Sequence, residues 1–442
     1  MGCDFWPLVY DQLWIIGPPP DYKILPRLAT SWDMEEGGKS WVFHLRHDGV
    51  FHDGVPVTAQ DVAFTMQYLP KADPAFSGDF GWDIDPEVAI IDDYTVRITF
   101  DNPAPREPDA AYFIPILPKH IWEPYKDNMT VFDNAEAIGS GPFKVKDFKP
   151  AQYIWFEANE DYWGGRPYVD EVVYKVYGSF DALNMAMKSG KIDMIGYSGC
   201  SALAVDELEA AENVKVIRSP GIGMVWLSFN LHKEGPIQDL DVRKAIMYAM
   251  DRDRMIEMVS LGYAEKADSW IYPELPEHNP NLPQYDYDPD EAKAILDQGG
   301  YIDSDGDGIR NDPATGRNME FDLLVTSVWT SAVKMATLIK EQLAEIDIAI
   351  DLVVLDLDTF YAYLYTPQND MYDIGFAEEE PGPYGAWMWE FARSFEAGGA
   401  GWNTSYYYNP EFDEILDKLT AEVDPEKRKE YLFEMQMMIA ED

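Results

Sequence analysis

The feature that most constrains this sequence is an alternation of short β-rich runs with longer helical patterns. The β-rich runs are Trp41–Leu45, Tyr94–Phe100, Glu171–Tyr177, Phe321–Thr326 and Ile348–Leu355. Strands that alternate with helices form sheets covered by helices, because each helix buries an apolar stripe against a sheet face. The pattern therefore predicts an α/β fold with mixed sheets, and 442 residues are enough for two or three domains.

Capping signals mark several helix ends. Thr58–Asp61 has the form of a capping box that begins a helix with an apolar face at residues 62, 66 and 69. Asp288-Pro289 and Asn409-Pro410 each place a cap residue before a proline at the first helical position. Gly299 should then end the helix that Pro289 begins.

Charge excludes some classes of partner. The chain has 34 Lys+Arg against 80 Asp+Glu, a net charge of −46, so it lacks the clustered cations that neutralise nucleic-acid phosphates. With 46% hydrophobic residues the composition is that of a folded protein with an acidic surface. Such a surface repels itself at low salt, so a saline habitat is one interpretation. The other interpretation of the charge is an ordinary acidic secreted protein.

No segment suggests a membrane span or a secretory signal. No apolar run reaches the roughly 18 residues that a membrane-spanning helix needs. The first ten residues, MGCDFWPLVY, lack the charged and apolar regions of a signal peptide.

Three longer stretches resemble one family. They are Leu25–Leu69, which contains SWVFHLRHDGVFHDG, Ile138–Ile195, which begins IGSGPF, and Leu227–Met255, which contains DVRKAIMYAMDRDRM. In their order along the chain and in their residues they resemble the family 5 extracellular solute-binding proteins of ATP-binding-cassette (ABC) importers, a group that binds oligopeptides, dipeptides, nickel or cello-oligosaccharides. The resemblance is specific for the family and much less so for the ligand.

The resemblance implies a two-lobed, periplasmic-binding-protein-like fold with an extra inserted domain and a hinge. Residues 1–16 and 154–235 would form lobe I, residues 17–153 the inserted domain II, and residues 236–442 lobe II. Lys233–Pro236 is the best candidate for one hinge crossing. Family members usually carry an export signal and continue beyond a helix such as the one ending near Asp442. We therefore expect lobe I to lack its terminal segments here.

Motifs for catalysis are largely missing from the sequence. Gly196–Cys200 lacks the final glycine of a nucleophile elbow, and no H-E-x-x-H, C-x-x-C or phosphate-binding glycine loop with lysine occurs. We therefore predict a binding protein that is not an enzyme and requires no cofactor. A secreted glycoside hydrolase with two facing carboxylates is a less favoured alternative, because sequence does not reveal that geometry.

Two groups of residues suggest metal ligands. His44, His47 and His52 are close in sequence, but residues an odd number apart on a strand point to opposite faces, which argues against zinc. Residues 303–312 fit a calcium loop better, with oxygen ligands at Asp303, Asp305, Asp307, Ile309 (carbonyl), Asn311 and Asp312. Ala314 stands where the bidentate Glu would be, so a hydrophilic turn without metal is the alternative.

Aromatic residues suggest the ligand site. The chain has 14 Trp and 27 Tyr, more than a core alone needs, and residues 376–408 are rich in both Gly and aromatic side chains. In the family this region lines the ligand cavity. The predicted ligand-binding residues are Trp226, Asn230, Trp329, Glu379, Trp387, Trp389, Trp402 and Tyr406. For each Trp, burial in the core is the competing interpretation.

The ligand class stays open between peptide and oligosaccharide. Peptide binders of the family typically carry an Asp here that pairs with the ligand ammonium, whereas this chain has Glu378–Glu380, and Glu379 is our candidate for that role. The aromatic pattern that ends at Arg393 also resembles the cello-oligosaccharide binders. We expect an extracellular or periplasmic, membrane-associated monomer that delivers oligopeptides to the membrane subunits of an ABC importer by hinge closure, with oligosaccharide as the alternative ligand.

Overall fold

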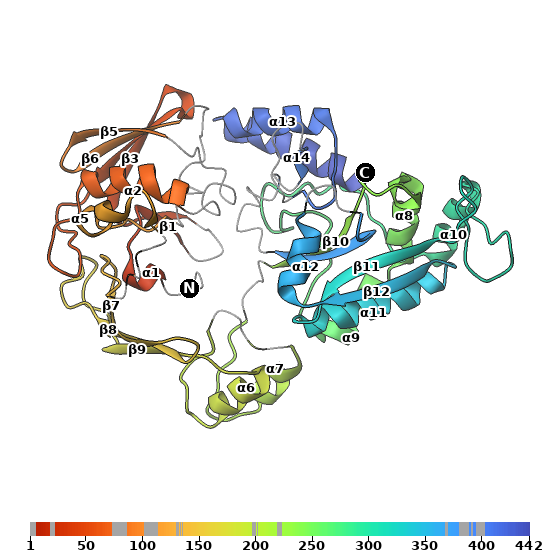
Figure 1. Ribbon diagram of the computed structural model, residues 1–442, viewed down its shortest axis with the longest axis horizontal. Helices are drawn as coiled ribbons and strands as arrows, with labels where there is room; N and C mark the ends of the chain where they lie inside the picture. Colours follow the sequence, from red (N-terminus) through yellow and green to blue (C-terminus); the bar gives the residue numbers. More distant parts are fainter. Residues whose placement is uncertain are drawn as a thin grey trace. The chain divides into compact units, whose positions relative to one another are not determined.

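The structure, a computed structural model, describes residues 6–17, 23–72, 86–100, 114–129, 132, 134, 136–196, 200, 202–218, 223–366, 370–379, 389, 392–394 and 403–442 (Figure 1). The chain forms two compact units, one of residues 1–200 and 420–425, the other of residues 201–419 and 426–442. This division is coarser than the expected one, and the boundaries near residues 16, 153 and 235 stay a prediction.

The main sheet of the first unit is antiparallel and has the strand order β3-β4-β6-β5. Its strands are β3 (Ala29–Glu35), β4 (Ser40–Leu45), β5 (Glu87–Asp92) and β6 (Thr95–Thr99). Helix α2 (Ala59–Ala72) packs on it and places Val62 and Met66 in one core with Phe43 and Ile98. Asp61 accepts hydrogen bonds from the N–H and the hydroxyl of Thr58, at 2.9 and 3.0 Å, and the first of these is one of the two bonds of a capping box.

A second sheet of this unit has the order β7-β8-β9, and β1 pairs with β2 in a short ribbon. The strands of these two sheets are β1 (Trp14–Ile16), β2 (Ile24–Pro26), β7 (Phe143–Lys149), β8 (Tyr153–Ala158) and β9 (Glu171–Lys175). The other described helices of the unit are α1 (Trp6–Val9), η1 (Glu36–Gly38), α5 (Lys119–Trp122), η3 (Glu123–Tyr125) and α6 (Phe180–Lys188).

A buried carboxylate joins distant segments of the first unit. Asp11 is fully buried and accepts hydrogen bonds from Arg27 Nε at 2.7 Å and from Trp163 Nε1 at 2.6 Å. The guanidinium of Arg46 lies 3.4 Å from the centroid of the Trp163 ring. A carboxylate is tolerated in such a place only when charged and polar donors surround it.

The IGSGPF motif packs against the N-terminal helix and against His52. A Cβ added to Gly139 would lie 2.0 Å from the carbonyl oxygen of Val9, so only glycine fits there. His52 Nδ1 accepts a hydrogen bond from the Gly139 N–H at 3.2 Å, and Nε2 donates to the Gly141 carbonyl at 3.1 Å. Burial is the main cause that lowers the pKa of His52 from 6.5 to about 4.

The second unit is built on a mixed sheet with the order β10-β13-β11-β12 (Figure 1). Its strands are β10 (Met224–Phe229), β11 (Glu320–Thr326), β12 (Ala349–Leu355) and β13 (Ile374–Glu379). Strand β11 runs parallel to β12 and β13, whereas β10 pairs antiparallel with β13. The predicted α/β pattern with mixed sheets is thus confirmed, and β10 is an edge strand of the sheet as described.

Helices cover both faces of this sheet. Leu323 and Val325 of β11 belong to a core that includes α8 and α11, whereas Leu324 packs with Phe360 and Leu364 of α12. This alternation follows from the two-residue period of a strand. The helices of the unit are α7 (Ala202–Glu209), η5 (Pro236–Gln238), α8 (Leu240–Ala249), α9 (Arg252–Ser260), α10 (Pro289–Gln298), α11 (Thr330–Ala344), α12 (Leu357–Leu364), α13 (Pro410–Ala421) and α14 (Pro425–Glu441).

The predicted caps of this unit are confirmed with one refinement. Asp288 accepts from the Glu291 N–H at 2.9 Å, and Asn409 accepts from two N–H groups of the first turn of α13. Helix α10 ends at Gln298 with Gly299 as its C-cap, but Gly299 has φ −73° and the left-handed residue is Gly300, with φ 82°. Among the described residues, no helix is long and apolar enough to cross a membrane.

Candidate functional site

A cavity of about 300 Å³ lies in the second unit beside β10. Its walls include the consecutive residues Met224, Val225, Trp226 and Leu227, together with parts of α8 and α14. Further lining residues are Ala267, Asp268, Ser269, Trp270, Pro283, Tyr285, Trp389, Ala392, Thr404, Ser405 and Tyr407. Consecutive strand residues point to opposite faces of a sheet, so a cavity that contacts all four runs along the edge of β10. This edge is unpaired within the described sheet.

Aromatic rings form one wall of the cavity. Trp270 lies between Trp226 and Trp389, with ring centroids 6.4 and 5.4 Å away and both contacts edge to face. Tyr285 and Tyr407 also line the cavity. Burial, together with a hydrogen bond to Asp442, raises the pKa of Tyr407, so its hydroxyl is a neutral donor. The wall combines flat apolar surface with a few polar tips, as ligand sites usually do.

Two of the predicted ligand-binding residues, Trp226 and Trp389, lie in this cavity. Trp226 is half-buried. Trp389 is only 1% exposed and belongs to a core cluster that includes Phe412, so packing accounts for most of its surface. Its indole Nε1–H is buried and has no acceptor in the part of the chain that the structure describes.

Three other predicted ligand residues have structural contacts outside the cavity lining. Asn230 is fully buried, donates to the Tyr372 carbonyl at 3.0 Å and accepts from the His232 N–H. Trp329 packs against Phe360 with centroids 5.9 Å apart. Tyr406 has φ 53° and donates its hydroxyl proton to the Thr366 carbonyl.

The remaining predicted ligand residues are only partly described or not described. The backbone of Glu379 ends β13, where it pairs with Met224. The side chain of Glu379, and the whole of Trp387 and Trp402, lie outside the described residues. Their roles in ligand binding stay predictions.

Sequence reasoning missed Trp270 and Tyr285, which also line the cavity. A signal for them was present. Residues 270–287, WIYPELPEHNPNLPQYDY, combine aromatic residues with prolines much as residues 376–408 combine them with glycines. Such segments bring rings to a surface without burying them in a regular element.

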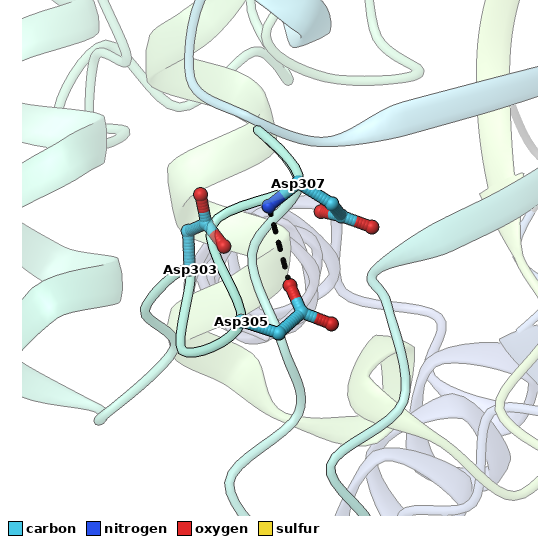
Figure 2. Close-up of side chains that lie close together, drawn as sticks. All are labelled: Asp303, Asp305 and Asp307. Carbon is cyan, nitrogen blue, oxygen red and sulfur yellow. Dashed lines mark hydrogen bonds between the residues drawn. The ribbon is translucent and has the colours of Figure 1, made fainter.

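The acidic loop between α10 and β11 brings three predicted calcium ligands together. One carboxylate oxygen from each of Asp303, Asp305 and Asp307 lies within 4.8 Å of the others, and all three residues are exposed (Figure 2). The Asp307 N–H donates to Asp305 at 3.3 Å, as the dashed line in Figure 2 shows. Hydrogen bonds from the backbone N–H groups of Gly308 and Gly306 lower the pKa of Asp303.

The other predicted calcium ligands have contacts of their own. Asn311 accepts from Ser304 at 2.7 Å and donates to Asn318 at 2.8 Å. Asp312 accepts from the Ala314 N–H and from the Thr315 hydroxyl. Ile309, whose carbonyl was the predicted ligand, donates its N–H to Asp307 at 2.9 Å. The structure therefore brings together Asp303, Asp305 and Asp307, and the roles of Ile309, Asn311 and Asp312 as calcium ligands stay predictions.

The strand argument does not apply to His44 and His47 as a pair, because β4 ends at Leu45 and His47 lies beyond it. His44 pairs with Asp33 at 3.1 Å, and His47 lies after the end of β4 with its ring 4.0 Å from that of Tyr94. Across the described residues, the three aspartates of the acidic loop are the one group of acidic, histidine or cysteine ligands close enough to share a metal.

Comparison with known proteins points to one family. The model for bacterial extracellular solute-binding proteins, family 5 Middle, matches residues 23–397. The oligopeptide-binding protein AppA of Bacillus subtilis is 29% identical over 369 residues, which are 79% of this chain and 65% of AppA. The dipeptide-binding protein of Escherichia coli is 24% identical over 94% of this chain and 79% of its own length.

A solved structure agrees with the sequence match. The structure of Bacillus subtilis AppA in complex with a nonapeptide has a TM-score of 0.82 and 25% identity, and the match covers 98% of this chain and 85% of that one. The expected periplasmic-binding-protein-like α/β fold is thereby confirmed. The chain spans less than two thirds of the full length of the AppA sequence.

Proposed function

The chain belongs to the family 5 bacterial extracellular solute-binding proteins, and on that premise we propose that it binds oligopeptides and delivers them to an ABC importer. The observation that carries this proposal is the aromatic cavity along the edge of β10, which has no neighbouring strand among the described residues. An extended peptide offers main-chain N–H and C=O groups to a strand edge and places its side chains alternately to either side. The peptide-binding names of the two relatives support the same ligand class.

The proposed mechanism requires ligand binding but no making or breaking of covalent bonds. Trp226 and Trp270 contact the ligand, and the backbone of β10 aligns it. Binding then favours the closed form of the two lobes, because the ligand has greater affinity for that form. The membrane subunits of the importer recognise the closed form outside the cell membrane. The protein acts as a monomer and leaves the bound peptide intact.

The test is a titration of peptides and cello-oligosaccharides into the protein and two variants. Trp226→Ala removes a half-buried cavity ring, whereas Tyr168→Ala removes a fully exposed ring of the first unit and serves as control. Stacked rings contribute about 0.5–1.5 kcal/mol beyond area burial, so Trp226→Ala should weaken peptide binding at least about twofold, whereas Tyr168→Ala should leave it unchanged.

Two results would contradict the proposal. Binding heat with oligosaccharides and none with peptides would show that the alternative ligand class is the right one. Peptide products formed by the protein itself, detected by mass spectrometry, would show an enzyme.

We also propose that the loop Asp303–Asp312 binds calcium, on the observation that three carboxylates gather in it. Their mutual repulsion disfavours this arrangement without a cation, and calcium prefers such oxygen ligands. Calorimetry should detect calcium binding that Asp305→Asn weakens. Asp351→Asn, at an exposed position of β12, should have no effect. No heat with calcium, or the same heat from both variants, would refute the site.

A further inference from the structure

The loop that carries Trp270 has no regular structure of its own. Every residue from 261 to 288, between α9 and α10, is described, and none belongs to a helix or a strand. Such a loop has no ladder of backbone hydrogen bonds that would hold a side chain in one direction. Yet its Trp270 lies between Trp226 and Trp389 in the cavity wall. Other contacts must therefore fix the loop.

A buried glutamine of α14, Gln436, makes these contacts. It is only 2% exposed, and its Oε1 accepts from the Ser269 hydroxyl at 2.8 Å and from the Asn279 N–H at 3.1 Å. Its Nε2 donates to the Glu277 carbonyl at 2.8 Å and to the Leu432 carbonyl of its own helix at 3.0 Å. One carboxamide thus ties both ends of the segment 269–279 to α14.

The amide of Gln436 has no hydrogen-bonding capacity left for a ligand. A carboxamide offers two donor hydrogens on nitrogen and two acceptor lone pairs on oxygen. All four are used within the protein. Gln436 is among the residues that line the cavity, but a ligand group could bind its amide only by breaking one of these bonds. The effect of the amide on a ligand therefore passes through the loop.

The hydrogen bonds of Gln436 add direction to the packing of the loop. Ile271 is 1% exposed and belongs to a core cluster with Leu432, and this apolar contact holds the loop down without fixing its orientation. Hydrogen bonds depend on angle. The Ser269 hydroxyl that donates to Gln436 also accepts from the Ile271 N–H at 3.1 Å. The residues on both sides of Trp270 are therefore linked to the amide.

We propose that Gln436 is a positioning residue of the ligand site and that its amide holds the Trp270 ring in the cavity wall. This inference rests on the proposed function, in which Trp270 contacts the bound peptide. A ring that is already held in place does not have to be ordered when the peptide binds. Loss of the amide would leave the ring present but badly placed, so peptide affinity would fall although no ligand contact had been removed.

The experiment is a double-mutant cycle with one nonapeptide, the ligand length in the AppA structure, measured by titration calorimetry. Gln436→Met removes the amide, keeps the length of the side chain and should weaken binding about 2- to 10-fold, as expected for one stacked ring. Trp270→Ala should weaken binding by a similar factor. In the Trp270→Ala background, Gln436→Met should cause no further loss, because the ring through which it acts is gone.

Gln342→Met is the matched control. Gln342 of α11 is 1% exposed, accepts from the Asp251 N–H at 3.2 Å and lies outside the cavity lining as described. Its replacement also removes a buried amide, so it should lower the melting temperature but leave the affinity for the nonapeptide unchanged. Thermal melting without peptide shows whether each variant folds. If Gln436→Met does not fold, Ser269→Ala removes one of its bonds to the loop and takes its place in the cycle.

The outcomes separate the positioning role from the proposed function. Unchanged affinity in Gln436→Met, or the same loss with and without the Trp270 ring, would overturn the positioning role and leave peptide binding intact. An equal loss in Gln342→Met would show that affinity only follows stability, and would overturn it too. No binding of the nonapeptide by the unaltered protein would overturn the proposed function and the positioning role together.

Discussion

Replacement of His52 with glutamine should remove a pH-dependent part of the stability of the first unit. His52 is held neutral between Gly139, which donates to Nδ1, and Gly141, which accepts from Nε2. Protonation at Nδ1 would set a donor against the Gly139 N–H. Burial is the main cause that lowers the pKa of His52 from 6.5 to about 4.

The sign and size of the effect follow from linkage. The folded protein binds the His52 proton less readily than the unfolded chain, so its stabilisation is complete above pH 6.5 and declines as the pH falls towards 4. With these two pKa values, the contribution of His52 at about pH 5 is smaller by about 2 kcal/mol than at about pH 7.5. Glutamine does not titrate and keeps one donor and one acceptor.

The assay is urea unfolding of the protein and of His52→Gln at the two pH values. The carboxylates are common to both proteins, so their titration cancels in the difference between them. The protein should be more stable than the variant at the higher pH, and the difference should shrink by about 2 kcal/mol at the lower pH. A difference that is constant with pH, or that grows on acidification, would refute the neutral, buried state of His52.

Three further predictions follow from packing and charge. Trp389→Ala should lower the free energy of unfolding by about 3–5 kcal/mol, because Trp389 is a core residue, and urea unfolding would contradict this if stability were unchanged. Calcium should raise the Tm of the unaltered protein but not that of the Asp307→Asn variant. Equal Tm shifts for the two proteins in differential scanning calorimetry would argue against calcium binding by the acidic loop. Potassium chloride should raise the Tm steadily towards molar concentrations, because it screens the net charge of −46, and a flat Tm would argue against a salt-adapted surface.

Local signals predicted the elements well, because they act within a few residues. The runs at Trp41–Leu45, Phe321–Thr326 and Ile348–Leu355 coincide with β4, β11 and β12 to within a residue or two. Asp288 and Asn409 cap the helices that follow them. Gly299 ends α10 as predicted, and the left-handed conformation that follows the helix falls on Gly300.

The candidate site was predictable only in part. Aromatic richness drew attention to Trp226 and Trp389, which line the cavity, but it could not separate a cavity wall from a core, and Trp389 is nearly all core. Trp270 joins the same wall from a distant loop, a contact between residues far apart in sequence that no local pattern encodes. The spacing of Asp303, Asp305 and Asp307 predicted their convergence, because a single tight loop holds all three.

By itself, the sequence determined the alternation of strands and helices, most of their ends, the family and the acidic surface, since each depends on residue type and short-range spacing. Tertiary structure alone decided which charges are neutralised. Asp11 is one of 80 acidic residues, yet only the fold surrounds it with Arg27 and Trp163. Burial and long-range contacts set the energy of a charge, and neither is a property of the residue type.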